Sequence, residues 1–221
     1  MMKRQGRCGM RLCSITGCLP VLMILAGGSN EMKVLGVIGS PRKKGNTETL
    51  LRAVLKGVEA AGGEIEVVRL CELRIQPCIG CGGCDKTGQC VLEDDMQELY
   101  PKILASQRLI LASPIYFYGI TAQAKGFVDR CQALWNRKRL LAEKGEWCKD
   151  PARKGFLVAV SATHGERVFE GAILTARYGF DAMGMGYGGD FLVKGKDGRG
   201  DMAQDAGTLV RAEEAGRKFM D

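Results

Sequence analysis

The chain has 221 residues, of which 46% are hydrophobic and 26% are charged. This composition predicts one globular domain with a sizeable core and excludes a disordered chain, a collagen and a multi-span membrane protein. The formal net charge is +7, but residues 1–31 hold four basic residues against Glu31, which leaves only +4 on the remainder. That remainder has no basic stripe interleaved with aromatic residues, so we expect no nucleic-acid partner.

Residues 1–31 are expected to precede the folded domain. They have a basic start and an apolar run of fifteen residues from Leu12 to Ala26, which resembles a secretory signal and is too short to span a bilayer. Alternatively, translation begins at Met32, directly before the first expected strand, and we favour this interpretation. We expect a domain over residues 32–221, a cytoplasmic location and no membrane partner, because clustered thiols are kept reduced in the cytosol.

Short aliphatic runs alternate with longer amphipathic stretches from Met32 onward. The runs predict strands at 33–38, 64–70, 108–113, 155–161 and 186–193, and the stretches predict helices at 47–61, 94–106, 121–135, 166–182 and 204–219. Residues suited to helix N-caps stand near three of these starts: Asn46 or Thr47, Asp94 or Asp95, and Thr121. This order predicts an α/β fold, a doubly wound five-stranded parallel sheet in a three-layer α/β/α arrangement.

The loop after the first strand reads Gly-Ser-Pro-Arg-Lys-Lys-Gly-Asn-Thr over residues 39–47. It joins the carboxyl end of a strand to the amino end of a helix, where free backbone N–H groups favour a phosphate. Its spacing matches neither the dinucleotide fingerprint nor the P-loop, so a terminal phosphate monoester fits better. A solvated strand-to-helix turn is the alternative.

Two further loops follow strands at the same expected sheet edge. Ser113-Pro114-Ile115-Tyr116-Phe117-Tyr118-Gly119 carries three consecutive aromatic residues, which suit a flat heteroaromatic ring and cannot all face one core. Ser161, Ala162 and Thr163 could complete a third wall, and we expect His164, the only histidine, to be solvated.

Four cysteines, Cys78, Cys81, Cys84 and Cys90, fall within thirteen residues and are spaced C-x2-C-x2-C-x5-C among glycines. This spacing is close to that of bacterial ferredoxins and favours a [4Fe–4S] cluster over a zinc site, free thiols or disulfides. The other cysteines of this region, Cys71, Cys131 and Cys148, are expected to be buried small hydrophobic residues.

The motifs at residues 39–47, 78–84 (Cys-Ile-Gly-Cys-Gly-Gly-Cys) and 113–116 (Ser-Pro-Ile-Tyr) resemble those of the iron–sulfur flavoproteins. These belong to the wider NADPH-dependent FMN reductase family, whose fold is flavodoxin-like. The resemblance implies that Ser40, Arg42, Asn46 and Thr47 hold the FMN phosphate, that Pro114, Ile115, Tyr116, Phe117 and Tyr118 lie against the isoalloxazine, and that the four cysteines bind the cluster. The full set of expected cofactor-binding residues adds Glu48, Ser161, Ala162 and Thr163.

The expected function is that of an FMN-dependent oxidoreductase, in which NAD(P)H reduces the flavin and the cluster passes electrons on singly. We expect an unidentified acceptor (a ferredoxin, a quinone or a small molecule), and the resemblance implies a homodimer or homotetramer. No acid–base residue is nominated as catalytic, because the cofactors carry the chemistry. The alternatives are an NAD(P)H:FMN or quinone reductase without a cluster and a non-enzymatic flavodoxin-like electron carrier.

Overall fold

Five parallel strands form the centre of the structure, a computed structural model that describes residues 32–221. Residues 1–31, which are expected to precede the folded domain, lie outside the described residues. The strands are β1 (Met32–Ile38), β2 (Gly63–Arg69), β3 (Arg108–Pro114), β4 (Lys154–Val160) and β5 (Gly186–Val193), in the order β2-β1-β3-β4-β5. This is the order of the flavodoxin-like fold, so the predicted fold class is confirmed.

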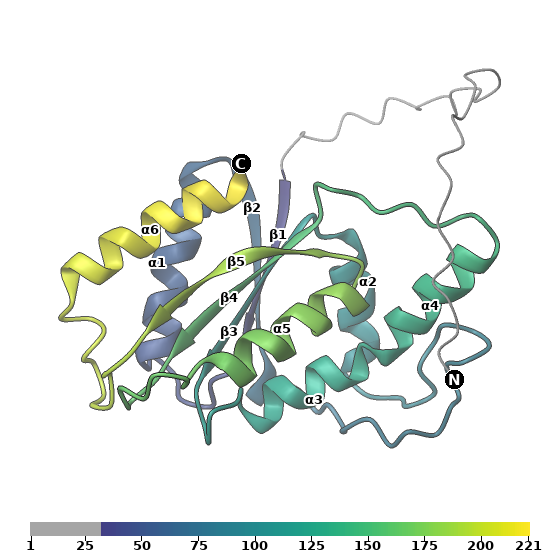
Figure 1. The fold of residues 1–221 in the computed structure, drawn as a ribbon, viewed down its shortest axis with the longest axis horizontal. Coiled ribbons are helices and arrows are strands. Elements are labelled where there is room, and N and C mark those ends of the chain that lie inside the picture. The colour runs from purple at the N-terminus through teal and green to yellow at the C-terminus, as the bar shows by residue number, and fades with distance from the viewer. Residues whose placement is uncertain (1–31) are drawn as a thin grey trace, which may run out of the picture. The chain divides into compact units, whose positions relative to one another are not determined.

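Helices cover both faces of the sheet (Figure 1). The first face carries α1 (Asn46–Ala60) and α6 (Ala206–Met220), and the second carries α2 (Met96–Ala105), α3 (Ala122–Arg130), α4 (Gln132–Glu143) and α5 (Glu170–Ala182). A single 3₁₀ turn, η1 (Leu70–Glu72), follows β2. No helix among residues 32–221 has the length and apolar character needed to cross a bilayer.

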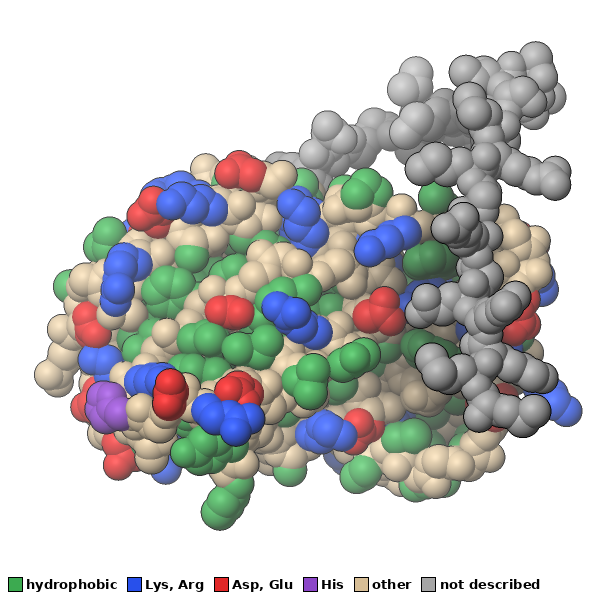
Figure 2. All heavy atoms as spheres, in the orientation of Figure 1, with side chains coloured by type: hydrophobic (Ala, Val, Ile, Leu, Met, Phe, Trp, Pro, Cys, Tyr) green, Lys and Arg blue, Asp and Glu red, His purple; other side chains and the backbone are tan. Residues whose placement is uncertain are grey.

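Two hydrophobic cores lie on the two faces of the sheet. Side chains alternate along a strand, so in β1 Leu35 and Val37 pack in the core beneath α2, α3 and α5, while Val34 and Ile38 pack with α1 and α6. The central strands β1, β3 and β4 are buried over most of their length, which is typical of parallel strands covered on both faces. Charged side chains of both signs are interspersed with hydrophobic ones on the face shown in Figure 2.

One predicted helix was wrong in its extent. The helix expected at 121–135 consists of α3 and α4, which meet at Cys131 and continue the helical stretch to Glu143. At the junction the Cys131 amide donates to Val128 O (3.0 Å). This bond spans three residues, as in a 3₁₀ turn, and it tightens the last turn of α3. The Thr121 cap was confirmed, because its Oγ1 accepts from the Ala124 amide (3.2 Å).

Two other local predictions require correction. The N-cap of α1 is Gly45 rather than Asn46 or Thr47, because the Asn46 side chain bonds to a distant segment of the chain. Of the three cysteines expected to be buried, only Cys131 is; Cys71 and Cys148 are exposed. Cys71 lies on the outer side of η1, whose Leu70 is the buried residue, and Cys148 lies in the irregular segment before β4.

Candidate functional site

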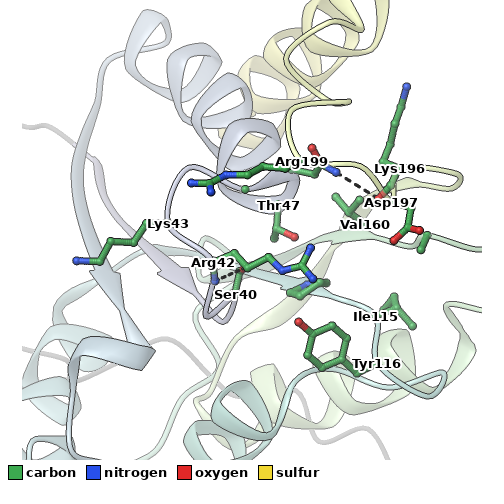
Figure 3. A pocket seen from close by; sticks show the side chains of 14 residues that line it. Ser40, Arg42, Lys43, Thr47, Ile115, Tyr116, Val160, Lys196, Asp197 and Arg199 are labelled. Atoms are coloured by element: carbon green, nitrogen blue, oxygen red, sulfur yellow. Dashed lines mark hydrogen bonds between the residues drawn. The ribbon is translucent and has the colours of Figure 1, made fainter.

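A cavity of about 560 Å³ lies at the carboxyl ends of β1 and β4 and beside the loop after β3. In a sheet of this order, β1 and β3 are the strands between which the chain changes direction, and ligands bind outside their carboxyl ends. The volume is within the range of cavities that hold cofactor-sized ligands. Its lining residues come from four segments, which follow β1, β3, β4 and β5 and form three walls around one space (Figure 3).

The first wall is the turn between β1 and α1. Ser40 and Thr47 line the cavity and are each only 3% exposed, so their hydroxyls are held in a protein environment rather than in bulk water. Gly45 places no side-chain acceptor on the start of α1, which leaves the first-turn amides available to an anion. Buried hydroxyls beside an uncapped helix start fit a phosphate group.

Close packing behind this turn fixes its path. The Gly39 amide donates to Ala112 O (2.7 Å) and Thr121 Oγ1 donates to Gly39 O (2.6 Å), which join the turn to β3 and α3. A Cβ on Gly39 would lie 2.8 Å from Ala124 Cβ, so only glycine allows this approach. The turn is therefore held rigidly at the mouth of the sheet.

Glu48 stabilises the same turn from the side away from the cavity. Its carboxylate accepts from the Lys44 amide (2.6 Å), where Lys44 has a left-handed φ of 55°, and pairs with Arg69 (2.6 Å) and Arg52 (2.7 Å). Burial alone would raise the pKa of Glu48, but the hydrogen bonds from Arg69, Arg52 and the Lys44 amide outweigh it and lower this pKa to about 2. Glu48 does not line the cavity.

The second wall comes from the loops after β3 and β4. Pro114, Ile115 and Tyr116 line the cavity opposite Val160 and Ala162 and give it an apolar side. Ser161 and Thr163 do not line it: Ser161 Oγ is buried and accepts from the Thr163 amide (3.1 Å), which shapes the turn. His164 is exposed, as predicted.

Phe117 and Tyr118 turn away from the cavity. Both have left-handed backbone angles (φ 49° and 64°), and two hydrogen bonds between Tyr116 and Gly119 (2.9 and 3.0 Å) close the tight turn that they occupy. Such angles are costly for residues with a Cβ, and turns that impose them are retained where they position a neighbouring group. Here the turn fixes Tyr116, while the Phe117 side chain is fully exposed.

The third wall was missed by sequence reasoning. Lys196, Asp197 and Arg199 belong to the segment after β5 and line the cavity beside the α1 start (Figure 3). Asn46 holds this segment: its Nδ2 donates to Lys196 O (3.3 Å) and Gly198 O (2.9 Å), and its Oδ1 accepts from the Met202 amide (3.1 Å). These contacts span about 150 residues of sequence, so no local pattern reveals them.

The cavity is positively charged overall. Lys43 pairs with Glu72 (2.6 Å) and Lys196 with Asp205 (2.8 Å), whereas Arg42 and Arg199 form no ion pair with any described residue. The Lys196 and Thr208 hydrogen bonds lower the pKa of Asp205 to about 2, so this partner is charged at neutral pH. Two guanidinium groups therefore remain for an anionic ligand.

The four cysteines line a second cavity of about 240 Å³. They lie on the irregular segment 73–95, which runs beside α3 and α4, and Gly80, Gly82 and Gly88 take left-handed φ values of 64°, 72° and 68° there. No group of three or more His, Cys, Asp or Glu side chains within residues 32–221 is arranged to hold a metal ion. All seven cysteines of the described region are free thiols.

A buried ion pair anchors the cysteine segment. Arg130, at the end of α3, pairs with Asp94 (2.5 Å) and donates to Gln76 O (2.8 Å), and Asp94 accepts from the amides of Gln76 and Met96. Burial would raise the pKa of Asp94, but these hydrogen bonds lower it, so the pair is ionised. The chemistry of the donor set suits a thiolate-bound cluster, because four cysteine sulfur atoms line one cavity.

The fold and the two cavities define a doubly wound α/β protein with a cavity of hydroxyl, arginine and apolar side chains at its switch point and a second cavity lined by cysteines. A family model described as NADPH-dependent FMN reductase matches residues 32–189, and the chain belongs to this family. The family predicted from sequence is thereby confirmed, and its members are NAD(P)H-dependent flavin oxidoreductases.

Two iron–sulfur flavoproteins are similar to about half of the chain. An iron–sulfur flavoprotein of Archaeoglobus fulgidus is 44% identical over 114 residues, which cover 52% of each chain. An iron–sulfur flavoprotein of Methanocaldococcus jannaschii is 42% identical over 103 residues, which cover 47% of this chain and 53% of the relative. The chain thus spans about half the length of these relatives.

The fold also resembles that of solved structures. An NAD(P)H:quinone oxidoreductase from Methanothermobacter marburgensis superposes with a TM-score of 0.62 at 19% identity and covers 86% of this chain and 97% of its own. At this identity the likeness shows the shared fold.

Proposed function

We propose that this chain is an FMN-dependent NAD(P)H oxidoreductase that passes electrons singly to an acceptor through a [4Fe–4S] cluster. The observation that carries the proposal is the pair of separate cavities, one lined by hydroxyls, arginines and an apolar wall, the other by all four clustered cysteines. The family match supports the flavin, and the iron–sulfur relatives support the cluster.

The protein's own groups bind and orient FMN in the first cavity. Ser40, Thr47 and the first-turn amides of α1 donate to the phosphate oxygens, and Arg42 and Arg199 balance its charge. Ile115, Tyr116 and Val160 contact the ring and exclude water from one side of it. Bound FMN supplies the conversion between a two-electron donor and one-electron steps.

In the second cavity, Cys78, Cys81, Cys84 and Cys90 supply the four thiolates, and a bound cluster supplies one-electron transfer. We place the protein in the cytoplasm, because thiolate ligands require reduced cysteines and all described cysteines are unpaired. The acceptor is a ferredoxin, a quinone or a small molecule, and the assembly is a homodimer or homotetramer.

A second candidate is an NAD(P)H:FMN or quinone reductase without a cluster. It is favoured by one observation, that the thiols of residues 32–221 are not arranged around a common metal position. The two candidates differ in iron content and share the flavin site.

Anaerobic purification followed by flavin, iron and acid-labile sulfide analysis distinguishes them. The proposal expects one FMN and about four irons with four sulfides per chain, whereas full flavin with little iron supports the second candidate. Stopped-flow mixing with NADH and with NADPH then tests turnover. Flavin that stays oxidised with both donors indicates an electron carrier reduced by another protein, and a colourless protein that takes up no FMN overturns the proposal.

A further inference from the structure

Arg130 has an unpaired buried donor at the cysteine cavity. The side chain is 1% exposed and lines this cavity together with the four cysteines. Both of its Nη atoms donate, to Asp94 and to main-chain carbonyls, but its Nε–H has no acceptor among residues 32–221. Buried donors are almost always paired, so this one indicates an acceptor that arrives with a ligand.

A second buried donor already contacts one of the sulfur atoms. Asn136 on α4 is 2% exposed, and its Nδ2 donates to Cys84 Sγ (3.1 Å) and to Asp85 Oδ1 (3.0 Å). Arg130 ends α3 and lines the cavity, whereas Asn136, one turn into α4, contacts the cavity lining through Cys84 and Asp85. Two donors from adjacent helices are thus fixed at one cluster of thiols.

We propose that Arg130 Nε–H and Asn136 Nδ2–H donate hydrogen bonds to the sulfur atoms of the cluster and raise its reduction potential. This inference rests on the proposed function. When the cluster accepts one electron, no bond is made or broken and the added negative charge is shared with the sulfur atoms. Hydrogen bonds to those atoms therefore stabilise the reduced form more than the oxidised form.

Both donors are suited to this role by their burial. An exposed donor is replaced by water when it is removed, but a buried donor leaves the sulfur without a partner. Asp94 neutralises the charge of Arg130, so the Nε–H acts as a fixed dipole that adds no net charge to the cavity. Arg130 and Asn136 thus tune the reduction potential through hydrogen bonds, and the cysteines are the ligands.

The test compares two amide-to-leucine variants on one helix. Asn136→Leu removes the donor to Cys84, whereas Gln132→Leu changes an exposed amide one turn away at the same cavity. Each variant is reconstituted anaerobically with iron and sulfide, and the cluster is titrated with dithionite while visible absorbance and EPR are recorded. We expect Asn136→Leu to lower the equilibrium constant for cluster reduction about tenfold, or about 59 mV for a one-electron couple, and Gln132→Leu to leave it unchanged.

Arg130→Lys tests the second donor, because lysine keeps a cation for Asp94 and removes the Nε–H. It is expected to lower the same constant without changing the flavin potential. Fully loaded Asn136→Leu and Arg130→Lys proteins with the wild-type potential would overturn the inference and leave the proposed function intact. Wild-type protein that takes up no iron and sulfide, or takes up zinc alone, would overturn both.

A measurement on the wild-type protein covers the case in which a variant fails to fold. Protein labelled with ¹⁵N only in arginine, or only in asparagine, is reduced, and its cluster is examined by pulsed EPR. We expect a ¹⁵N coupling from each label, because each N–H contacts a sulfur atom. Absence of coupling from both labels in a fully loaded cluster would contradict the inference.

Discussion

Arg42 offers a free charge to the proposed FMN phosphate, because no described carboxylate pairs with it and it lines the first cavity. A hydrogen bond to a charged group contributes about 1.5 to 3 kcal/mol, so we expect Arg42→Ala to weaken FMN binding by about 10- to 100-fold. Quenching of flavin fluorescence on titration of the apoprotein measures this. Lys44→Ala is the matched control, since Lys44 is a nearby exposed cation outside the cavity lining; equal losses in the two variants would contradict a specific role for Arg42.

The lowered pKa of Glu48 makes the free energy of unfolding depend on pH. Because the pKa of Glu48 is lowered in the folded protein to about 2, its contribution is fully present above its ordinary pKa near 4.5 and is lost as the pH falls through about 2. We expect Glu48→Gln to lower the free energy of unfolding at pH 7 by about 3 kcal/mol, as for other broken buried ion pairs. Urea unfolding at pH 7, 4 and 3 should show this difference shrinking toward acid pH.

The control for Glu48 is Glu59→Gln, an exposed change on the same helix. It should leave the free energy of unfolding within about 0.5 kcal/mol of the wild-type value, as surface substitutions do. A Glu48→Gln defect of constant size from pH 7 to pH 3 would show that the carboxylate charge is not its cause.

The crossing of α1 and α6 depends on two glycines. A Cβ on Gly57 would lie 1.8 Å from Glu213 O, and one on Gly216 would lie 2.0 Å from Val54 O, so the two backbones touch. We expect Gly57→Ala and Gly216→Ala each to destabilise the protein by about 3 kcal/mol, because the helices must separate. Thermal and urea unfolding measure this loss.

Gly126 in α3 provides the matched control for this crossing. A Cβ there would meet nothing within 4 Å, and alanine is a better helix former than glycine. Gly126→Ala should therefore raise the free energy of unfolding by about 0.5 to 1 kcal/mol. A loss of stability at Gly126 similar to that at Gly57 would mean that helix packing is not what distinguishes the two sites.

Elements whose signal is local were predictable from sequence. The strands were predicted within one residue at either end, because each is a short apolar run between polar turns. The break at Cys131 was not, since the amphipathic pattern continues across the single tightened turn that makes it. The segment carrying Arg199 was missed for a different reason: Asn46 holds it through hydrogen bonds to main-chain atoms that are distant in sequence.

The candidate site also has parts that the sequence predicts and parts that it does not. The carboxyl ends of parallel strands share one edge, so Ser40, Thr47, Ile115, Tyr116 and Ala162 could be placed together from strand order alone. The strained turn at Phe117 and Tyr118 was not foreseen, because residues with a Cβ rarely take left-handed angles. That Phe117 and Tyr118 lie against the isoalloxazine stays a prediction, as does the role of every other expected cofactor-binding residue.

At the scale of the whole molecule, the two cavities share no lining residue and are held by different parts of the fold. The first depends on the β1 turn and the segment after β5, and the second depends on Arg130, Asp94 and α4. Changes at sites with no shared partners are usually additive. We therefore expect Cys81→Ser to abolish the iron-dependent visible absorbance while the dissociation constant for FMN changes less than twofold, measured on anaerobically prepared protein. Serine differs from cysteine by one atom and Cys81 is exposed, so the fold should be retained. Loss of flavin together with the cluster from a folded Cys81→Ser protein would show that the two sites are coupled across the α3–α4 side of the sheet.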